Sequence, residues 1–295
     1  MPRGVYTEGA STPVIAREWA LESREPWRRI SRMTTALITG GSSGIGAAFA
    51  RALAARGDDL VLVARDETRL AAIAAELHAA HGIHVEVLRA DLADRADVLR
   101  VAERLADNDR PIDLLVNNAG FSVRARLLDA DFAQHDEGID VMIRTVLVLG
   151  GVAGRTMAER GRGGIITVGS VAGHLTMSAY SAIKAWANSY SQGLSNELRG
   201  TGVTATLLMP GWVTTEFHGR AGIGTRSIPG FLWLDADRLV RVALRDHDRG
   251  KAVSIPSARF VFLSWLLRVI PKRTLRWVSW RISSQRRKDT AALTT

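Results

Sequence analysis

The chain has 295 residues, a hydrophobic content of 46% and a mean hydropathy of +0.03. This composition predicts one large globular domain with a sizeable core and excludes a disordered chain. The absence of cysteine excludes disulfides and thiolate metal sites, and the seven histidines show no metal-binding spacing, so we expect no metal. The formal net charge is +9 and is unevenly distributed along the chain.

Residues 1–32 precede the first predicted element. They contain arginines and glutamates but no apolar run of the kind found in a signal peptide, so they do not predict secretion. Met33 directly precedes the first strand, and we hypothesise that residues 1–32 are either an extension ahead of a natural start or a loosely attached arm. We therefore divide the chain into that extension (1–32), an α/β domain (33–257) and a basic tail (258–295).

A strand, a glycine-rich turn and a helix open the α/β domain. Ala36–Ile38 predicts a buried strand, residues 39–46 read TGGSSGIG, and Gly44–Ala55 has helical spacing of apolar residues. Glycines let the backbone turn sharply and approach a pyrophosphate, and the helix start offers N–H groups to it. The glycine spacing differs from the commonest dinucleotide fingerprint, so this segment alone also fits an ordinary Gly/Ser turn.

More predicted strands follow, separated by segments long enough for helices such as Glu67–His81. These strands are Asp59–Ala64, Ile83–Leu88, Asp113–Val116, Gly164–Val168 and Val203–Met209. The alternation predicts an α/β fold with a Rossmann-like, doubly wound parallel sheet, in a single domain with a C-terminal helical tail. Ligands bind at the carboxyl ends of such strands, where Gly40, Asn117, Ser170 and Pro210 fall.

In this order, the motifs resemble those of the short-chain dehydrogenase/reductase family. The resemblance covers Thr34 to Pro256 and rests on TGGSSGIG, NNAG (117–120), Ser170 and YSAIK (180–184) taken together. It implies an oxidoreductase that uses a nicotinamide cofactor to interconvert a carbonyl group and an alcohol. It also implies a small-molecule substrate and a homo-oligomer. The positive charge alone would fit nucleic acid, but the sequence shows no recognition module, so we expect no nucleic acid as partner.

Tyr180 and Lys184 lie four residues apart on the predicted helix Ser178–Leu198, so they share a face. The ordinary pKa of tyrosine is about 10, and a nearby ammonium with an oxidised nicotinamide would lower it. Tyr180 could then act as general acid in reduction and as base in oxidation. By resemblance, Lys184 also holds the nicotinamide ribose and Ser170 orients the substrate carbonyl. One alternative is that Tyr180 and Lys184 form an ordinary pair on an exposed helix surface. Another is that Ser178, and not Ser170, is the serine that orients the carbonyl.

The resemblance further implies a set of cofactor-binding residues. They are Gly40, Ser42, Ser43, Gly44, Ile45, Gly46, Arg65, Asp91, Leu92, Asn118, Ala119, Gly120, Tyr180, Lys184, Pro210, Gly211, Val213 and Thr215. Arg65 follows the second strand, where NAD enzymes usually place an acid, and its guanidinium suits a ribose 2′-phosphate. We therefore predict NADP(H) in preference to NAD(H). Alternatively, Arg65 begins a solvated loop and Asp91 caps the helix that starts near Asp94.

Met142 departs from the family pattern. The family often has an asparagine there, which helps to hold a water in the proton relay, whereas a thioether is a weak acceptor and no donor. We expect either a relay through backbone and water alone or reduced turnover. The alternative function is therefore an NADP(H)-binding protein with little turnover, docked through its tail.

The segment Trp212–Leu234 follows Pro210 and Gly211, where family members close their substrate pockets. It is apolar and contains glycine, which is typical of a mobile lid; its large apolar residues include Phe217, Ile223, Ile228, Phe231 and Trp233. We expect a hydrophobic carbonyl or alcohol as substrate, unless these residues simply pack on the core. The segment between Ser170 and Tyr180 is shorter than usual, which trims one wall of the pocket.

The tail carries the positive charge. Nine basic residues and no acidic residue lie between Arg259 and Lys288, and the rest of the chain has equal numbers of both. The apolar run Phe260–Ile270 is too short to span a bilayer, and after Pro271 one face carries Leu275, Val278 and Ile282. Basic residues with tryptophans (Trp265, Trp277 and Trp280) fit a helix on an anionic membrane surface. The same pattern fits equally well a pair of C-terminal helices that pack on the substrate pocket or on another subunit. We expect a cytoplasmic protein with possible peripheral membrane contact.

Overall fold

The centre of the protein is a parallel sheet. A computed structural model describes residues 34–213, 230, 233–271, 273, 274, 276, 277, 279 and 280. Its main sheet has seven strands in the order β3-β2-β1-β4-β5-β6-β9, and each neighbouring pair is parallel. The strands are β1 (Thr35–Thr39), β2 (Asp59–Ala64), β3 (Val85–Arg89), β4 (Leu114–Asn117), β5 (Gly163–Val168), β6 (Val203–Leu208) and β9 (Val253–Ser254). A second, two-stranded sheet pairs β7 (Trp212–Val213) with β8 (Trp233–Leu234).

This architecture confirms the doubly wound parallel sheet predicted from the sequence. The six predicted strands are present with small shifts at their ends. The seventh strand, β9, was not predicted because two residues are too short to show a pattern. It is defined by its pairing with β6, in which Val253 lies opposite Leu207.

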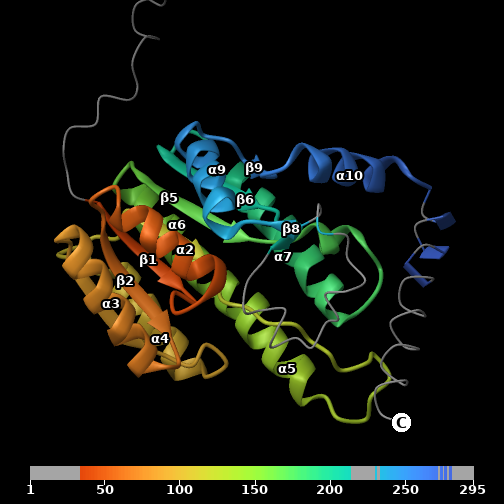
Figure 1. Ribbon diagram of the computed structural model, residues 1–295, viewed down its shortest axis with the longest axis horizontal. Coiled ribbons are helices and arrows are strands. Elements are labelled where there is room, and N and C mark those ends of the chain that lie inside the picture. The colour runs from red at the N-terminus through yellow and green to blue at the C-terminus, as the bar shows by residue number, and fades with distance from the viewer. Residues whose placement is uncertain are drawn as a thin grey trace, which may run out of the picture. The chain divides into compact units, whose positions relative to one another are not determined.

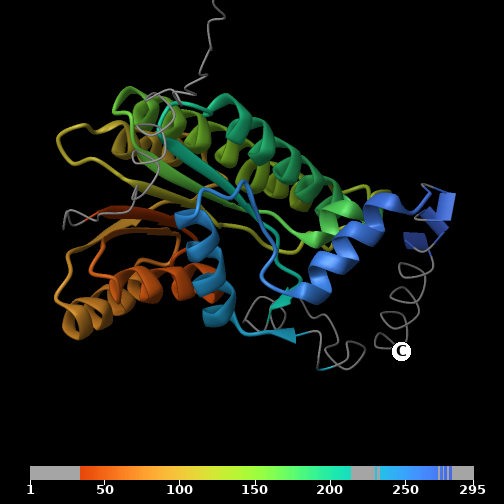
Figure 2. The same ribbon diagram turned by 90° about the horizontal axis from the view of Figure 1, so that it is seen from above.

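Helices cover both faces of the sheet (Figures 1 and 2). One buried cluster joins the sheet to α4, α6 and α7, and another joins it to α2, α3 and α9. The helices are α2 (Gly44–Ala54), α3 (Glu67–His81), α4 (Arg95–Ala106), α5 (Ala133–Ile139), α6 (Thr145–Glu159), α7 (Ala179–Glu197), α9 (Ala236–Asp248) and α10 (Ala258–Val269). Because both faces are covered, the central strands are apolar throughout; residues 60–63 of β2 are almost fully buried.

The helix ends follow local chemistry. The Asp66 carboxylate accepts a hydrogen bond from the Arg69 N–H at the start of α3, and Gly82 ends that helix in the left-handed conformation at φ +69°. A short side-chain acceptor and a glycine are the preferred residues for these two positions. This is why the predicted limits of α3 match the observed ones.

One helix is continuous from α5 to α6 through a π-helical turn at Asp140–Arg144. Residues Ala133–Glu159 are long and apolar enough to cross a membrane by composition, yet 56% of the most apolar window is buried against the protein. The helix belongs to the layer that covers the sheet. Its π-helical turn contains Met142, and such turns often occur at functional sites.

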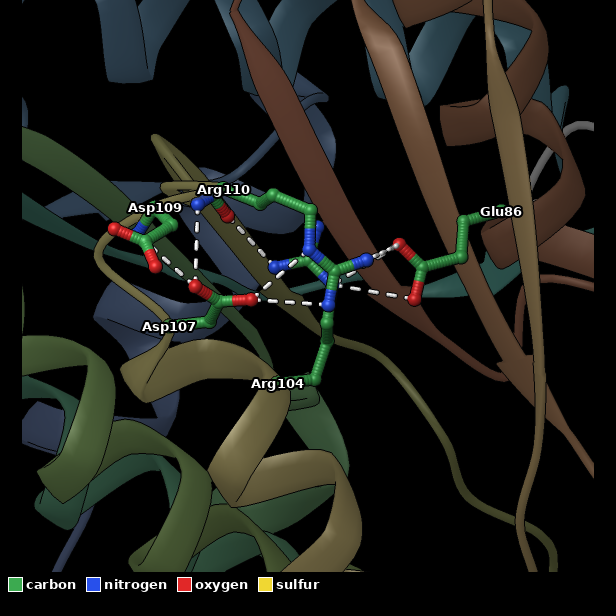
Figure 3. A network of polar contacts seen from close by, with 5 residues as sticks. All are labelled: Glu86, Arg104, Asp107, Asp109 and Arg110. Atoms are coloured by element: carbon green, nitrogen blue, oxygen red, sulfur yellow. Dashed lines mark hydrogen bonds and ion pairs between the residues drawn. The ribbon is translucent and has the colours of Figure 1, made fainter.

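A polar network fixes α4 to β3 (Figure 3). The Arg104 side chain is almost buried; its Nε donates to the Glu86 carboxylate at 3.0 Å and its Nη1 donates to the Arg110 carbonyl at 2.7 Å. Arg110 in turn pairs with Asp107 at 2.9 Å. This loop leads into the start of β4, so the network stabilises the sheet edge opposite to the carboxyl ends of the strands.

Candidate active site

The glycine turn between β1 and α2 has the geometry of a phosphate cradle. A Cβ on Gly46 would lie 2.2 Å from the Gly40 carbonyl oxygen, so only glycine fits there. Gly40 and Gly44 have φ values of +67° and +57°, which glycine adopts at little cost. Ser43 caps α2 without a side-chain hydrogen bond, and the first turn has no acidic residue. The positive end of the helix is therefore not neutralised, which suits a pyrophosphate.

Asn118 connects the cradle to the end of β4. Its Nδ2 donates to the Thr39 carbonyl at 2.8 Å, and its backbone N–H donates to Thr39 Oγ1 at 2.9 Å. A Cβ on Gly40 would meet Asn118 Nδ2 at 2.9 Å, so the two segments pack without spare room. The motifs around 40 and 118, far apart in sequence, thus form one rigid edge. The Asn118 contacts fix the turn that leads into α2, and the N–H groups at the start of that helix suit a dinucleotide phosphate.

Ser170, Tyr180 and Lys184 converge at the carboxyl end of β5. Tyr180 shares a hydrogen bond with Ser170, and Lys184 Nζ lies 5.9 Å from the centre of the Tyr180 ring. Lys184 is buried, with Nζ donating to the Val168 carbonyl at 2.8 Å. Ser178 instead caps α7 by accepting from the Ser181 N–H at 3.3 Å. The geometry therefore favours Ser170 over Ser178, and Tyr180 with Lys184 is not a surface pair.

Burial shifts the pKa values of Tyr180 and Lys184. Burial raises the pKa of Tyr180 to about 12, and the hydrogen bond with Ser170 opposes this only in part. Burial also lowers the pKa of Lys184 to about 8, since the charged ammonium is poorly solvated. The predicted lowering of the Tyr180 pKa, by Lys184 together with an oxidised nicotinamide, stays a prediction because it depends on the cofactor. In the protein alone the partly buried phenol stays protonated at neutral pH, and the raised pKa makes it a weaker acid.

Asn188 is a site residue that the sequence reasoning missed. Its side chain is buried one turn beyond Lys184 on α7; Oδ1 accepts from the Ser170 N–H at 3.2 Å and Nδ2 donates to the Ser170 carbonyl at 2.9 Å. Gly169 and Gly173 flank the carboxamide, and a Cβ on either would clash with it at 2.1 and 2.5 Å. Helical spacing from Tyr180 was the signal that could have indicated it. Asn188 fixes the backbone that carries Ser170.

Met142 lies next to the same cluster. It is 1% exposed, and a Cβ on Gly120 would meet its Sδ at 3.0 Å and Lys184 Nζ at 3.8 Å. The thioether therefore occupies the space between Gly120 and the lysine. Met142 and Lys184 thus both lie beside Gly120, and the role of residue 142 in a proton relay stays a prediction. The side chain offers no hydrogen-bond donor there.

Arg65 and Asp91 lie at the ends of neighbouring strands. Arg65 is 65% exposed, and its Nη1 lies 3.2 Å from Glu137 Oε1 of α5. Asp91 does not cap α4: Asp94 does so by accepting from the Asp97 N–H, while Asp91 Oδ1 accepts from the Ala93 N–H at 3.0 Å. The capping alternative for Asp91 is therefore wrong.

The other predicted site residues occupy the same edge. Leu92 is buried and its carbonyl accepts from Thr145 Oγ1 at 2.9 Å; Val171 N–H donates to the Pro210 carbonyl at 3.1 Å. Val213 is buried in β7. Thr215 and the lid residues Phe217, Ile223, Ile228 and Phe231 lie outside the described residues, as do Leu275, Val278 and Ile282 of the tail.

The tail reaches this edge through α10. A Cβ on Gly211 would lie 2.1 Å from the Phe260 ring, and Trp212 contacts the same ring at a centroid distance of 5.8 Å. Farther along, the Thr176 N–H donates to Ser279 Oγ at 3.3 Å, and Ser279 is 1% exposed. The packing alternative for the tail is thus correct for one side of α10. The segments after Ser170 and Pro210 are both in contact with the tail.

The chain is similar to known proteins in sequence and in structure. The family model described as short chain dehydrogenase matches residues 34–223. A short-chain dehydrogenase from Sphingobium yanoikuyae in complex with NADPH is 38% identical, with a TM-score of 0.72, and the match covers 81% of this chain and 96% of that chain. A short chain dehydrogenase/reductase from Burkholderia phymatum in complex with NAD is 25% identical, with a TM-score of 0.69 and coverage of 79% and 92%. The very-long-chain 3-oxoacyl-CoA reductase of Anas platyrhynchos is 31% identical over 258 residues, 81% of this chain and 77% of that protein.

Proposed function

Because the chain belongs to the short-chain dehydrogenase family, we propose that it is an NADP(H)-dependent oxidoreductase that interconverts a carbonyl group and a secondary alcohol on a hydrophobic substrate. The observation that carries the proposal is the hydrogen-bonded pair Ser170–Tyr180 with Lys184 buried beneath it. The pair lies at the same sheet edge as the glycine cradle, so one dinucleotide could reach both. The bound nicotinamide would supply or accept the hydride.

The protein's own groups would handle the proton and the developing charge. In ketone reduction, Tyr180 would donate its phenolic proton to the carbonyl oxygen, and the Ser170 hydroxyl would hydrogen-bond that oxygen as its charge grows. The raised pKa of Tyr180, about 12, keeps the phenol protonated at neutral pH. Lys184, held against the Val168 carbonyl, would bind the nicotinamide ribose and place a positive charge near the phenol.

Several observations bear on the cofactor and the substrate. Arg65 follows β2 at the position where NAD enzymes usually have an acidic residue, and its guanidinium favours the 2′-phosphate of NADP(H). The similar structure in complex with NADPH supports this choice. Another similar structure is in complex with NAD, so the comparisons alone support only a nicotinamide cofactor. The contact between Trp212 and Phe260 gives the substrate side an apolar wall. The similarity to an enzyme of very-long-chain acyl substrates also favours a hydrophobic carbonyl compound.

The alternative is an NADP(H)-binding protein with little turnover, docked to a membrane or partner through its tail. Met142 favours it, because the thioether beside Lys184 cannot order a relay water by donating a hydrogen bond. In either case we propose a cytoplasmic protein and a homo-oligomer. Leu147 on α6 is 49% exposed and lies on one of the two long helices that would pair.

The decisive experiment follows NADPH absorbance across a panel of ketones, with Tyr180→Phe as the matched variant. The variant lacks only the hydroxyl, and we expect its kcat to fall by about 1,000-fold, within the range of general acid catalysis. NADPH affinity, measured by fluorescence, should change little because the ring is kept. Equal background oxidation by both proteins across the panel would favour the binding protein instead.

A further inference from the structure

The two sides of α10 have opposite characters. Phe260 and Ser264 are buried against the core, and the partly buried Leu263 and Leu267 pack near them. The opposite side carries Phe262, Trp265 and Val269, whose side chains are 62, 56 and 55% exposed. Spacings of three and four residues place these three on one helical stripe.

Two more exposed aromatic residues follow α10 in the chain. Trp277 and Trp280 are 55 and 62% exposed, while Ser279 between them is buried and accepts from the Thr176 N–H. We define the tail surface as the exposed aromatic and apolar residues Val261, Phe262, Trp265, Val269, Trp277 and Trp280. Large exposed apolar groups gathered on one element mark an interaction site rather than ordinary surface.

The charges beside the tail surface are all positive. Arg259 and Arg268 on α10, and Arg273 and Arg276 beyond it, are exposed, and residues 259–288 contain no Asp or Glu. A second copy of this surface would bring like charges together, which disfavours self-association. Aromatic side chains flanked by arginines instead match the interfacial region of a bilayer with anionic headgroups.

We propose that the tail surface docks on an anionic lipid membrane, with α10 lying in the plane of the interface. Twelve residues are too few to span a bilayer, and the buried Phe260 side keeps the helix on the protein. α10 contacts the 3-10 turn Val171–His174 that follows Ser170. The helix that faces lipid thus also contacts Gly211 and the segment after Ser170. This inference goes beyond the proposed redox function and is tested without turnover.

The test is flotation of the full-length protein with phosphatidylcholine vesicles, with or without phosphatidylglycerol. We expect flotation only with the anionic vesicles, and less of it at high salt. The double variant Phe262→Ser/Trp265→Ser should bind at least about tenfold more weakly, since two exposed aromatic groups lose their lipid contact. Arg273→Gln/Arg276→Gln should bind roughly 25-fold more weakly, at about 1 kcal/mol per arginine.

A charge-matched control is available on α9. Arg241→Gln/Arg245→Gln removes two exposed arginines from a helix that packs against α2, and it should float like the wild type. Because all substituted side chains are exposed, thermal unfolding should be unchanged in each variant. Equal flotation of the wild type and the aromatic variant would overturn the proposal. A change of oligomeric mass without a change in flotation would overturn it too, in favour of self-association.

Discussion

The Asn188 carboxamide holds the backbone of Ser170 at both its N–H and its carbonyl group, at 3.2 and 2.9 Å. A side chain on α7 thereby sets the position of a residue on the segment after β5. Tyr180 and Lys184 belong to the same helix, so α7 positions all three side chains proposed for catalysis. Asn188 is a positioning residue, because no reacting atom needs to touch it.

We expect Asn188→Asp to lower kcat by about 100-fold with little change in NADPH affinity. The carboxylate keeps the acceptor but loses the donor, so the Ser170 carbonyl loses its partner and the hydroxyl shifts. Steady-state kinetics measure kcat, and NADPH titration measures the affinity for the cofactor. Gln192→Ala is the control, since Gln192 Nε2 donates to the Asn188 backbone carbonyl at 2.8 Å and this hydrogen bond does not involve the carboxamide. Equal losses of kcat and NADPH affinity would instead indicate general damage to the fold.

Met142→Asn should raise kcat by about tenfold, because an amide at this position can hydrogen-bond a relay water beside Lys184. The same change should lower the free energy of unfolding by about 2 kcal/mol, since the side chain is 1% exposed and its pocket is apolar. Turnover and chemical denaturation are measured on the same protein. Met142→Leu preserves volume without polarity, and a similar gain in that variant would contradict the relay explanation.

Arg65→Ala should reduce kcat/KM for NADPH by roughly 10- to 100-fold while leaving that for NADH within about twofold, as expected for a lost charge-assisted phosphate contact. Glu137→Gln is the matched control, since it removes the carboxylate that lies 3.2 Å from Arg65. We expect that variant to use NADPH at least as well as the wild type. If Arg65→Ala affects both cofactors equally, the 2′-phosphate assignment is wrong.

His247 should make the protein less stable in acid. Burial lowers the pKa of His247 to about 4 from an ordinary 6.5, and its Nδ1 lies 2.9 Å from Thr206 Oγ1. The unfolded chain takes up the proton first, so stability is complete above pH 6.5 and falls as the pH drops toward 4, by up to about 3 kcal/mol. Urea unfolding across this range measures the slope. His247→Gln should flatten it, and an equal slope in the variant would assign the effect to the acidic residues.

The sequence by itself determined the order of strands and helices. Apolar runs such as Leu60–Val63 must be buried on both faces, and caps such as Asp66 and Gly82 end helices locally, so these limits could be predicted. The glycine turn could also be predicted. Gly40 and Gly44 adopt positive φ values, and Gly46 leaves no room for a Cβ beside the Gly40 carbonyl.

Only the tertiary structure decided the environment of each group. Burial raises the Tyr180 pKa in the protein without cofactor, and no local sequence pattern predicts that burial. The role of Asn188 follows from the packing of α7 against the segment after β5. The strand β9 is defined by its pairing with β6. The tail is both packed and exposed: Phe260 fills the space over Gly211, which leaves Phe262 and Trp265 on the outside. Residues distant in sequence meet only when the chain folds, and their solvation and partners are set there.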